Sequence, residues 1–267
     1  MPDEIWIDET ETIEDLGRAG FRLIQNKTGF RYGEDTVLLA WFADLRVSAR
    51  KKQVKAIELG SNCGAATMLL AARRKNIFLD AVEILPSAEK IFRRNILLNG
   101  LSGRVRSYCL DIRDLISHSH PDICKASYDL VFFNPPYRSL HRGPITQTAI
   151  KSPDLLAARF EISGTTCDFI AAAEMLLVPQ GTLVMVHRVS RLPEVLTLMN
   201  HAHIEPTSLR FVHPKIGKQA TLFMLSGTKA GKPGGFQVIE PLILYGEDDK
   251  YTKECMAIYH EENAGII

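Results

Sequence analysis

The chain has 267 residues, 46% of them hydrophobic, which suffices for one substantial core and argues against extensive disorder. Its 32 basic and 31 acidic residues leave a formal net charge of +1, so total charge indicates no particular partner. The five cysteines are scattered without a C-x-x-C pair, the amino terminus is acidic, and no run of 18 apolar residues occurs. We therefore expect no disulfide scaffold, no secretory leader and no membrane span, but a cytoplasmic protein.

The charges are unevenly distributed along the chain. Residues 1–15 hold seven acids and no bases, residues 18–55 carry a local net charge of +6, and residues 240–262 carry −5. Only the basic region would suit a polyanion, because opposite charge is what attracts such a partner.

The first 50 residues predict an extension before the main domain. Residues 1–16 predict an extended lead-in, and residues 18–32 predict short strands and turns. Residues 33–43 predict a helix whose apolar positions begin directly after a cap at Asp35 or Thr36.

From residue 54 onward, strand patterns and helix patterns alternate, which predicts an α/β fold. Apolar runs predict strands at 54–59, 77–83, 105–110, 128–133 and 181–186. Stretches with helical patterning predict helices at 65–73, 87–99 (with Ser87 as its cap), 155–178 and 191–200. An antiparallel pair is expected at 209–213 and 220–225, then a tail from 231 that drapes over the core and ends in a turn or helix at 251–259.

Three strand ends carry residues typical of a nucleotide site. The first strand runs into a Gly-Ser-Asn-Cys-Gly loop at 60–64 that precedes a helix, and Asn62 tolerates the left-handed conformation better than most residues. Glu83 ends the second strand 23 residues after Gly60, close to the offset of about 20 residues for a ribose-binding acid. Asp111 follows the third strand, at the edge where open α/β sheets bind ligands.

The strand at 128–133 ends in Asn134-Pro135-Pro136-Tyr137. The prolines have no N–H and a φ fixed at about −65°, so the strand stops in a rigid corner. The Asn134 amide oxygen and the Pro135 carbonyl can each accept one hydrogen of a planar amine, while the Tyr137 ring stacks on its face. An ordinary turn would also use Asn-Pro, but four specific residues after such a strand favour the clamp.

Two other stretches were considered as sites. Residues 138–153 form a long basic loop directly after the corner, which favours a role facing the substrate. His118, His120 and Cys124 lie close together in sequence, but no second ligand pair accompanies them. A polar loop is therefore favoured over a metal site, and we expect no metal.

Together these residues resemble the class I S-adenosylmethionine-dependent methyltransferases, in particular the bacterial tRNA1(Val) adenine-N6-methyltransferase family. The resemblance covers nearly the whole chain and rests on 32–43, 58–64, Glu83, Asp111, 134–137, Ala158-Arg159 with Glu161, and 241–252. Glu58 stands where the family usually has Asp, and Asn62 where it usually has Gly. The resemblance implies a Rossmann-like seven-stranded sheet with helices on both faces, in which a short N-terminal extension (1–52) caps the cofactor pocket of a methyltransferase domain (53–267).

The resemblance also implies S-adenosylmethionine as the cofactor and a role for each motif. Glu83 would accept the ribose hydroxyls, and Asp111 the amino hydrogens of the cofactor's adenine. The cofactor-binding residues would be Asp35, Thr36, Glu58, Gly60, Ser61, Asn62, Gly64, Glu83, Ile84, Asp111 and Ile112. The clamp residues Asn134, Pro135, Pro136 and Tyr137 would be catalytic. Contacts to RNA would come from Arg31, Arg138, Arg142 and Lys151.

The implied reaction is N6-methylation of an adenine in the anticodon loop of a tRNA, at a position like 37. Such a pocket needs an unstacked base, and a loop nucleotide can be flipped into it. A glutamine-N5 protein methyltransferase uses the same clamp but usually carries a helical N-terminal domain. A guanine-N2 rRNA methyltransferase more often has Phe in place of Tyr137, and a binding module without catalysis is supported only by the altered glycine loop.

Overall fold

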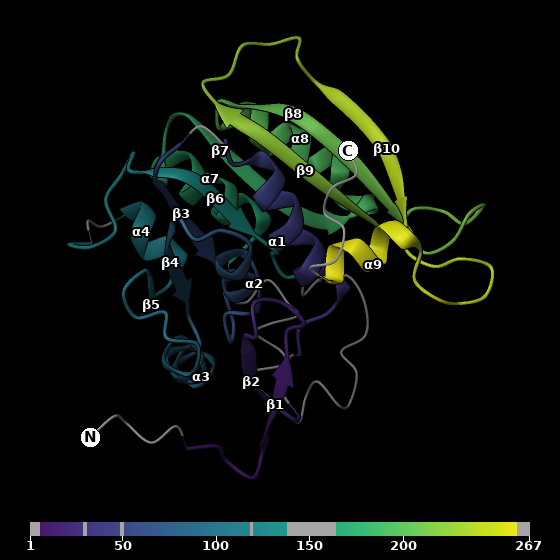
Figure 1. The fold of residues 1–267 in the computed structure, drawn as a ribbon. Helices are drawn as coiled ribbons and strands as arrows, with labels where there is room; N and C mark the ends of the chain where they lie inside the picture. Colours follow the sequence, from purple (N-terminus) through teal and green to yellow (C-terminus); the bar gives the residue numbers. More distant parts are fainter. Residues whose placement is uncertain (1–5, 29–30, 49–50, 118–119, 138–163, 261–267) are drawn as a thin grey trace.

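The structure is a computed structural model that describes residues 6–28, 31–48, 51–117, 120–137 and 164–260. Its main sheet is built from β3 (Val54–Leu59), β4 (Ile77–Glu83), β5 (Val105–Cys109), β6 (Tyr128–Phe133), β7 (Leu177–Arg188), β8 (Ile204–His213), β9 (Leu222–Lys229) and β10 (Gln237–Ile243). The strand order is β10-β8-β9-β7-β6-β3-β4-β5, and only β9 runs antiparallel to its neighbours (Figure 1). This arrangement confirms the Rossmann-like α/β fold.

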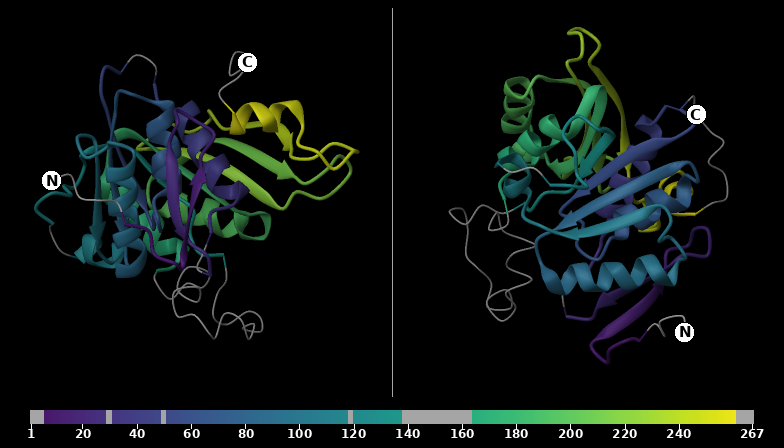
Figure 2. Two further views of the ribbon diagram at one scale, coloured as in Figure 1. Left: turned by 60° about the horizontal axis from the view of Figure 1, so that its bottom comes forward. Right: turned by 90° about the vertical axis from the view of Figure 1, so that its left-hand side faces the viewer.

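Helices cover both faces of the sheet (Figure 2). One face carries α1 (Glu34–Arg46), α2 (Ala65–Arg73), α3 (Pro86–Leu98) and α9 (Lys253–Tyr259). The other face carries α4 (Ile112–Ser117), α7 (Thr166–Leu176) and α8 (Leu192–His201). Each face has its own hydrophobic core, and β3 contributes to both because successive side chains of a strand point to opposite faces.

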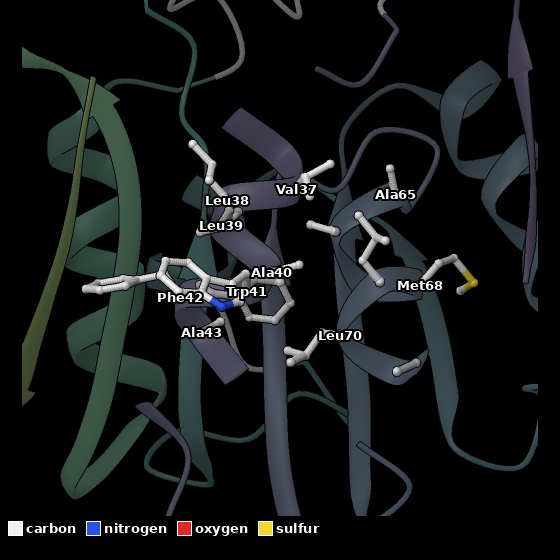
Figure 3. Close-up of a cluster of buried hydrophobic side chains, with 14 of the residues drawn as sticks. Val37, Leu38, Leu39, Ala40, Trp41, Phe42, Ala43, Ala65, Met68 and Leu70 are labelled. Atoms are coloured by element: carbon white, nitrogen blue, oxygen red, sulfur yellow. The ribbon is translucent and has the colours of Figure 1, made fainter. Parts of the chain in front are cut away.

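The first helix, α1, is the most deeply embedded part of the N-terminal extension. Eight consecutive residues, 36–43, are buried, so the helix is enclosed on all sides. Figure 3 shows Trp41 and Phe42 of α1 in this cluster, with Ala65 and Met68 of α2 opposite. This packing fixes the start of α1 relative to the sheet. The division of the chain into 1–52 and 53–267 stays a prediction.

Three predicted helix boundaries were wrong. Gly33 is the N-cap of α1 and no side chain caps the helix, so Asp35 and Thr36 lie inside its first turn. Likewise, α3 begins at Pro86 rather than at a Ser87 cap, because proline suits the first turn of a helix.

The third wrong boundary belongs to the helix predicted over 155–178. Residues 155–163 lie outside the described part of the chain, and α7 begins after Thr165. The Thr165 hydroxyl accepts from the Asp168 amide, and the Asp168 carboxylate accepts from the Thr165 amide, which is a capping box. Leu177 and Val178 already belong to β7.

The carboxyl-terminal tail adds a strand instead of draping over the core. β10 pairs with β8 in parallel at the edge of the sheet, which extends the seven expected strands to eight. Pro241 lies within β10, as an edge position allows. The expectation of a draped tail was therefore wrong, while the expected antiparallel pair (β8 and β9) and the terminal helix (α9) are confirmed.

The lead-in contains an antiparallel hairpin of β1 (Glu11–Asp15) and β2 (Arg22–Asn26), which lies beside α3 (Figure 2, right). Asn95 of α3 and Asn99, the residue that caps the end of α3, pair with the backbone of β2. Asn95 accepts from the Ile24 amide (2.7 Å) and donates to the Ile24 carbonyl (2.9 Å), and Asn99 does the same at Arg22 (2.8 Å each). Because residues four apart lie on the same side of a helix, both side-chain amides face β2. They bond to its backbone as a neighbouring strand would.

We predict that Asn95→Ala lowers the free energy of unfolding by about 3 kcal/mol, because it leaves buried backbone groups without partners. Asn95 is fully buried and also donates to the Cys63 carbonyl at 2.9 Å. The matched control is Asn99→Ala, where water can reach the backbone of Arg22, and a loss of about 1 kcal/mol is expected. Urea unfolding measures both values, and equal losses would contradict the assigned role of Asn95.

Candidate active site

The carboxyl ends of β3, β4, β5 and β6 meet at one edge of the sheet, around a cleft of about 840 Å³ counted to its open mouth. The predicted site residues that line the cleft are Thr36, Glu58, Gly60, Ser61, Asn62, Glu83, Ile84, Ile112, Asn134 and Pro136. The cleft thus joins the glycine loop to the Asn-Pro-Pro-Tyr corner.

The glycine loop needs left-handed backbone at three positions. Gly60, Asn62 and Gly64 have φ values of +70°, +50° and +84°, so the expected conformation of Asn62 is confirmed. Two facts exclude a side chain at Gly64. Its positive φ is unfavourable for other residues, and a Cβ there would lie 2.1 Å from the ring of Phe92. Gly64 itself lies below the cleft rather than in its lining.

Glu83 holds the glycine loop in place. Its two carboxylate oxygens accept backbone N–H groups from Asn62 (2.7 Å) and Leu85 (2.9 Å). Glu83 also lines the cleft, where its carboxylate can only accept hydrogen bonds. Glu83 is therefore both a structural link between two loops and an acceptor at the wall of the cleft.

Two buried polar groups in the cleft wall, the Glu58 carboxylate and the Ser61 hydroxyl, are not fully balanced by hydrogen bonds or opposite charges from the described part of the protein. Burial raises the pKa of Glu58 to about 8, and the nearby Glu83 adds to this increase. The hydrogen bonds from Thr67 lower the pKa, but by less. The Ser61 hydroxyl is buried and bonds to none of the described residues. A ligand with a positive charge and hydrogen-bonding groups would suit this end of the cleft.

The other end of the cleft is apolar. It is lined by Ile84, Leu85, Leu110, Ile112 and Phe169. Asp111 is not part of the lining. Its carboxylate accepts from the Arg113 side chain (Nε to Oδ1, 2.9 Å) and backbone (2.9 Å), and these contacts lower the pKa of Asp111.

The corner after β6 is organised by a residue of α1. One carboxylate oxygen of Asp35 accepts from Asn134 Nδ2 (3.0 Å) and from the Tyr137 hydroxyl (2.7 Å). A carboxylate only accepts, so the amide nitrogen of Asn134 must face Asp35. The Asn134 oxygen lies 2.5 Å from the Tyr137 hydroxyl, which stays protonated because burial and Asp35 raise the pKa of Tyr137 well above its usual value. Pro135 is buried behind this group.

The Tyr137 ring is supported by β7. It stacks on His187 with centroids 5.3 Å apart, and the guanidinium carbon of Arg188 lies 5.2 Å from its centre. His187 Nδ1 accepts from the Arg188 amide (2.9 Å), and Nε2 lies 3.3 Å from the Thr166 hydroxyl. Burial, with Arg191 and Arg188 nearby, lowers the pKa of His187 to about 3, so the imidazole is neutral.

The structure brings most predicted residues together and separates others. Arg31 forms an ion pair with Glu14 on the surface. Arg138, Arg142 and Lys151 lie outside the described residues. Eight residues of the lining were not predicted as site residues: Tyr32, Leu39, Cys63, Ala65, Val82, Leu85, Leu110 and Phe169. Phe169 lies on α7, far along the chain from the other motifs, and only the capping box before it could have placed the start of that helix.

Two features are absent from the described ranges of the chain. These ranges contain no cluster of three or more His, Cys, Asp or Glu side chains that could hold a metal ion. Within the same ranges, no helix has both the length and the apolar character needed to cross a bilayer.

No family model matches the sequence. It is similar to curated proteins named tRNA1(Val) (adenine(37)-N6)-methyltransferase. The one from Serratia proteamaculans is 30% identical over 175 residues, which cover 63% of this chain and 61% of that protein. The one from Flavobacterium psychrophilum is 26% identical over 243 residues, which cover 89% and 94%. The chain thus spans about three fifths of the first relative and nearly all of the second.

Solved structures share the fold. A protein of Agrobacterium tumefaciens described as a predicted O-methyltransferase superposes with a TM-score of 0.64, at 19% identity over 84% of this chain and 95% of its own. The TYW2 protein of M. jannaschii, solved in complex with AdoMet, gives 0.54 at 16% identity over 84% and 87%.

The fold, the cleft at the strand ends and these likenesses define a class I S-adenosylmethionine-dependent methyltransferase. Within that class, the curated proteins to which the chain is similar are named tRNA1(Val) (adenine(37)-N6)-methyltransferase.

The low pKa of His187 predicts a specific loss of stability in acid. The unfolded chain takes up a proton near pH 6.5 and the folded protein only near pH 3, so stability falls as pH drops between these values. Between pH 7 and 5 the wild type should lose about 2 kcal/mol more than His187→Gln, which does not titrate. Urea unfolding at both pH values tests this. Equal losses would show that His187 is protonated in the folded protein.

Proposed function

We propose that the protein transfers the methyl group of S-adenosylmethionine to N6 of an adenine in the anticodon loop of a tRNA, in the cytoplasm. The observation that carries this proposal is the hydrogen-bonded group of Asp35, Asn134 and Tyr137 at one end of the cleft. It presents a fixed amide oxygen beside the cofactor cleft. The names of the sequence relatives support the choice of substrate.

The cleft residues fit the cofactor by their chemistry. Glu58, Gly60, Ser61, Asn62 and Gly64 would hold the methionine part, where a cationic group favours the ionised form of Glu58 and the Ser61 hydroxyl gains a partner. When bound, the cofactor supplies an electrophilic methyl group.

The remaining cofactor-binding roles follow from position. Glu83 would accept the ribose hydroxyls, and Ile84 and Ile112 would flank the adenine ring. Asp111 would accept the adenine amino hydrogens while it keeps its bond to Arg113. Thr36 would close the cleft from the side of α1, which is the capping role proposed for residues 1–52.

The clamp would act by alignment. The exocyclic amine of adenine is a weak nucleophile because its lone pair is delocalised into the ring. The Asn134 oxygen and the Pro135 carbonyl would hold its two hydrogens, which leaves the lone pair directed at the methyl group. Orientation of this kind contributes several kcal/mol, roughly 7 at the low end of well-oriented cases. No base is needed before attack, since the proton leaves after the new C–N bond has formed.

Asp35 would strengthen this clamp in two ways. Its bond to Nδ2 polarises the Asn134 amide, so the oxygen becomes a better acceptor. Its negative charge also lies near the amine, where positive charge develops during transfer. The Tyr137 hydroxyl has one hydrogen, which it donates to Asp35, so the lone pairs of the Asn134 oxygen remain for the substrate.

An RNA substrate fits the need for an unstacked base. A base inside a duplex cannot reach such a site, whereas a loop nucleotide can be flipped onto the clamp. Arg31, Arg138, Arg142 and Lys151 would contact phosphates, so binding should weaken with salt.

Methyl transfer itself is tested with purified protein, radiolabelled S-adenosylmethionine and either bulk tRNA or a translation release factor. We expect the label in tRNA, recovered as N6-methyladenine on nucleoside analysis. Label in the release factor alone would point to a glutamine acceptor and refute the proposal. Label recovered as N2-methylguanine would refute the choice of base.

Two substitutions separate the clamp from the cofactor site. Asn134→Ala should lower kcat by about 10²-fold or more, and Asp35→Asn by about tenfold, while cofactor affinity stays unchanged, because both act on the acceptor amine. Calorimetry measures cofactor binding, and single-turnover transfer measures the chemical step.

The matched control for these variants is Glu34→Gln. Glu34 is the neighbouring acid on α1, and its carboxylate accepts from the hydroxyls of Tyr245 and Tyr251 rather than from the clamp. It should keep the wild-type kcat. Loss of cofactor binding in Asn134→Ala would show that the assigned role of Asn134 is wrong.

A further inference from the structure

Arg188 stands beside the clamp at the end of β7. β7 pairs with β6 up to Phe133, which lies opposite Met185, so β7 continues three residues past the point where the Asn-Pro-Pro-Tyr corner begins. Arg188 is the last residue of β7 and is exposed. Its guanidinium lies over the Tyr137 ring. No prediction from sequence pointed to this position.

The charge of Arg188 is not neutralised by any acid in the described part of the chain. Neighbouring cations at the same sheet edge differ in this respect, since Arg191 pairs with Glu194 (2.7 Å) and Lys215 with Asp249 (2.6 Å). The recorded side-chain contact of Arg188 is the face of Tyr137, a cation–π contact that leaves the five N–H donors of the guanidinium largely available.

Tyr137 therefore has two different neighbours from β7. His187 and Arg188 leave the strand on opposite sides, because consecutive strand residues alternate. His187 is fully buried, neutral and bonded to Thr166, so it supports the ring from inside. Arg188 supplies a positive charge on the solvent side of the same ring.

We propose that Arg188 binds a phosphate of the RNA strand next to the flipped adenine; this inference rests on the proposed function. An adenine held by Asn134 carries its neutral base into the cleft and leaves its sugar and phosphates on the solvent side, where Arg188 stands. The planar guanidinium fork matches two phosphate oxygens, which a lysine cannot do in the same way. The contact with Tyr137 holds the arginine beside the clamp before RNA arrives.

The first test is the RNA dependence of Arg188→Ala. We expect KM for a tRNA anticodon stem-loop to rise about tenfold, with kcat at saturating RNA and cofactor affinity unchanged. The slope of log KM against log salt should fall by about 0.7, the value for one phosphate contact in a single strand. Arg188→Lys should recover the salt slope but only part of the affinity.

The matched control is Lys232→Ala. Lys232 is exposed in the loop between β9 and β10, at the opposite edge of the sheet, so it should keep wild-type KM and salt slope. If Arg188→Ala is poorly folded by its melting temperature, Arg188→Gln takes its place, because it removes the charge and keeps a polar side chain.

A neutral methylphosphonate placed beside the target adenine locates the contact. With the wild-type protein, KM for this modified RNA should rise as much as KM for the unmodified RNA rises in Arg188→Ala. Combining the modified RNA with Arg188→Ala should raise KM no further. Fully additive effects would place the arginine at another phosphate and overturn the proposal. A lower kcat with unchanged KM would also overturn it, since Arg188 would then act only by holding Tyr137. Wild-type protein that methylates no RNA would refute the proposed function instead.

Discussion

The site depends on one carboxylate oxygen of Asp35, which ties the first helix to the corner after β6. It accepts from both Asn134 and Tyr137, and because it cannot donate, it dictates which way the Asn134 amide turns. Asp35 is itself held in place, since the buried run 36–43 anchors α1 against the sheet. A part of the chain that precedes the Rossmann-like core thus sets the geometry of the acceptor clamp. Rigid support of this kind is what alignment catalysis requires.

The cofactor cleft is also preformed, by bonds from outside the glycine loop. Glu83 accepts from the Asn62 amide, Asn95 donates to the Cys63 carbonyl, and Glu58 accepts from Thr67. The loop therefore keeps its shape although it has Asn62 where the resemblance predicts a third glycine. Because Asn62 already adopts the left-handed conformation that glycine would supply, the departure costs little.

Local patterns predicted the elements and failed where a partner lies far along the chain. The strands at 54–59, 77–83 and 128–133 were predicted with their observed ends, because Gly60 follows the first, Glu83 ends the second, and Asn134-Pro135 follows the third. Asp35 was predicted as a helix cap and as a cofactor-binding residue, since sequence alone could not reveal that Asn134 and Tyr137 both donate to its carboxylate. The edge strand β10 and the inward position of Phe169 depend on tertiary neighbours that no local pattern encodes.

The arrangement of charges around Tyr137 bears on the choice between RNA and protein acceptors. A glutamine side chain and an adenine offer the clamp the same NH₂ group, so Asn134 cannot tell them apart. They differ in what lies behind that group, since a nucleotide carries an anionic phosphate and a peptide backbone is neutral. In the proposed complex Asp35 would lie on the side of the amine, and Arg188, which pairs with no acid of the described residues, would lie on the solvent side of the ring. A nucleotide has a neutral amine at one end and a negative charge at the other, so it matches both Asp35 and Arg188. This arrangement favours a nucleotide over a peptide as the acceptor.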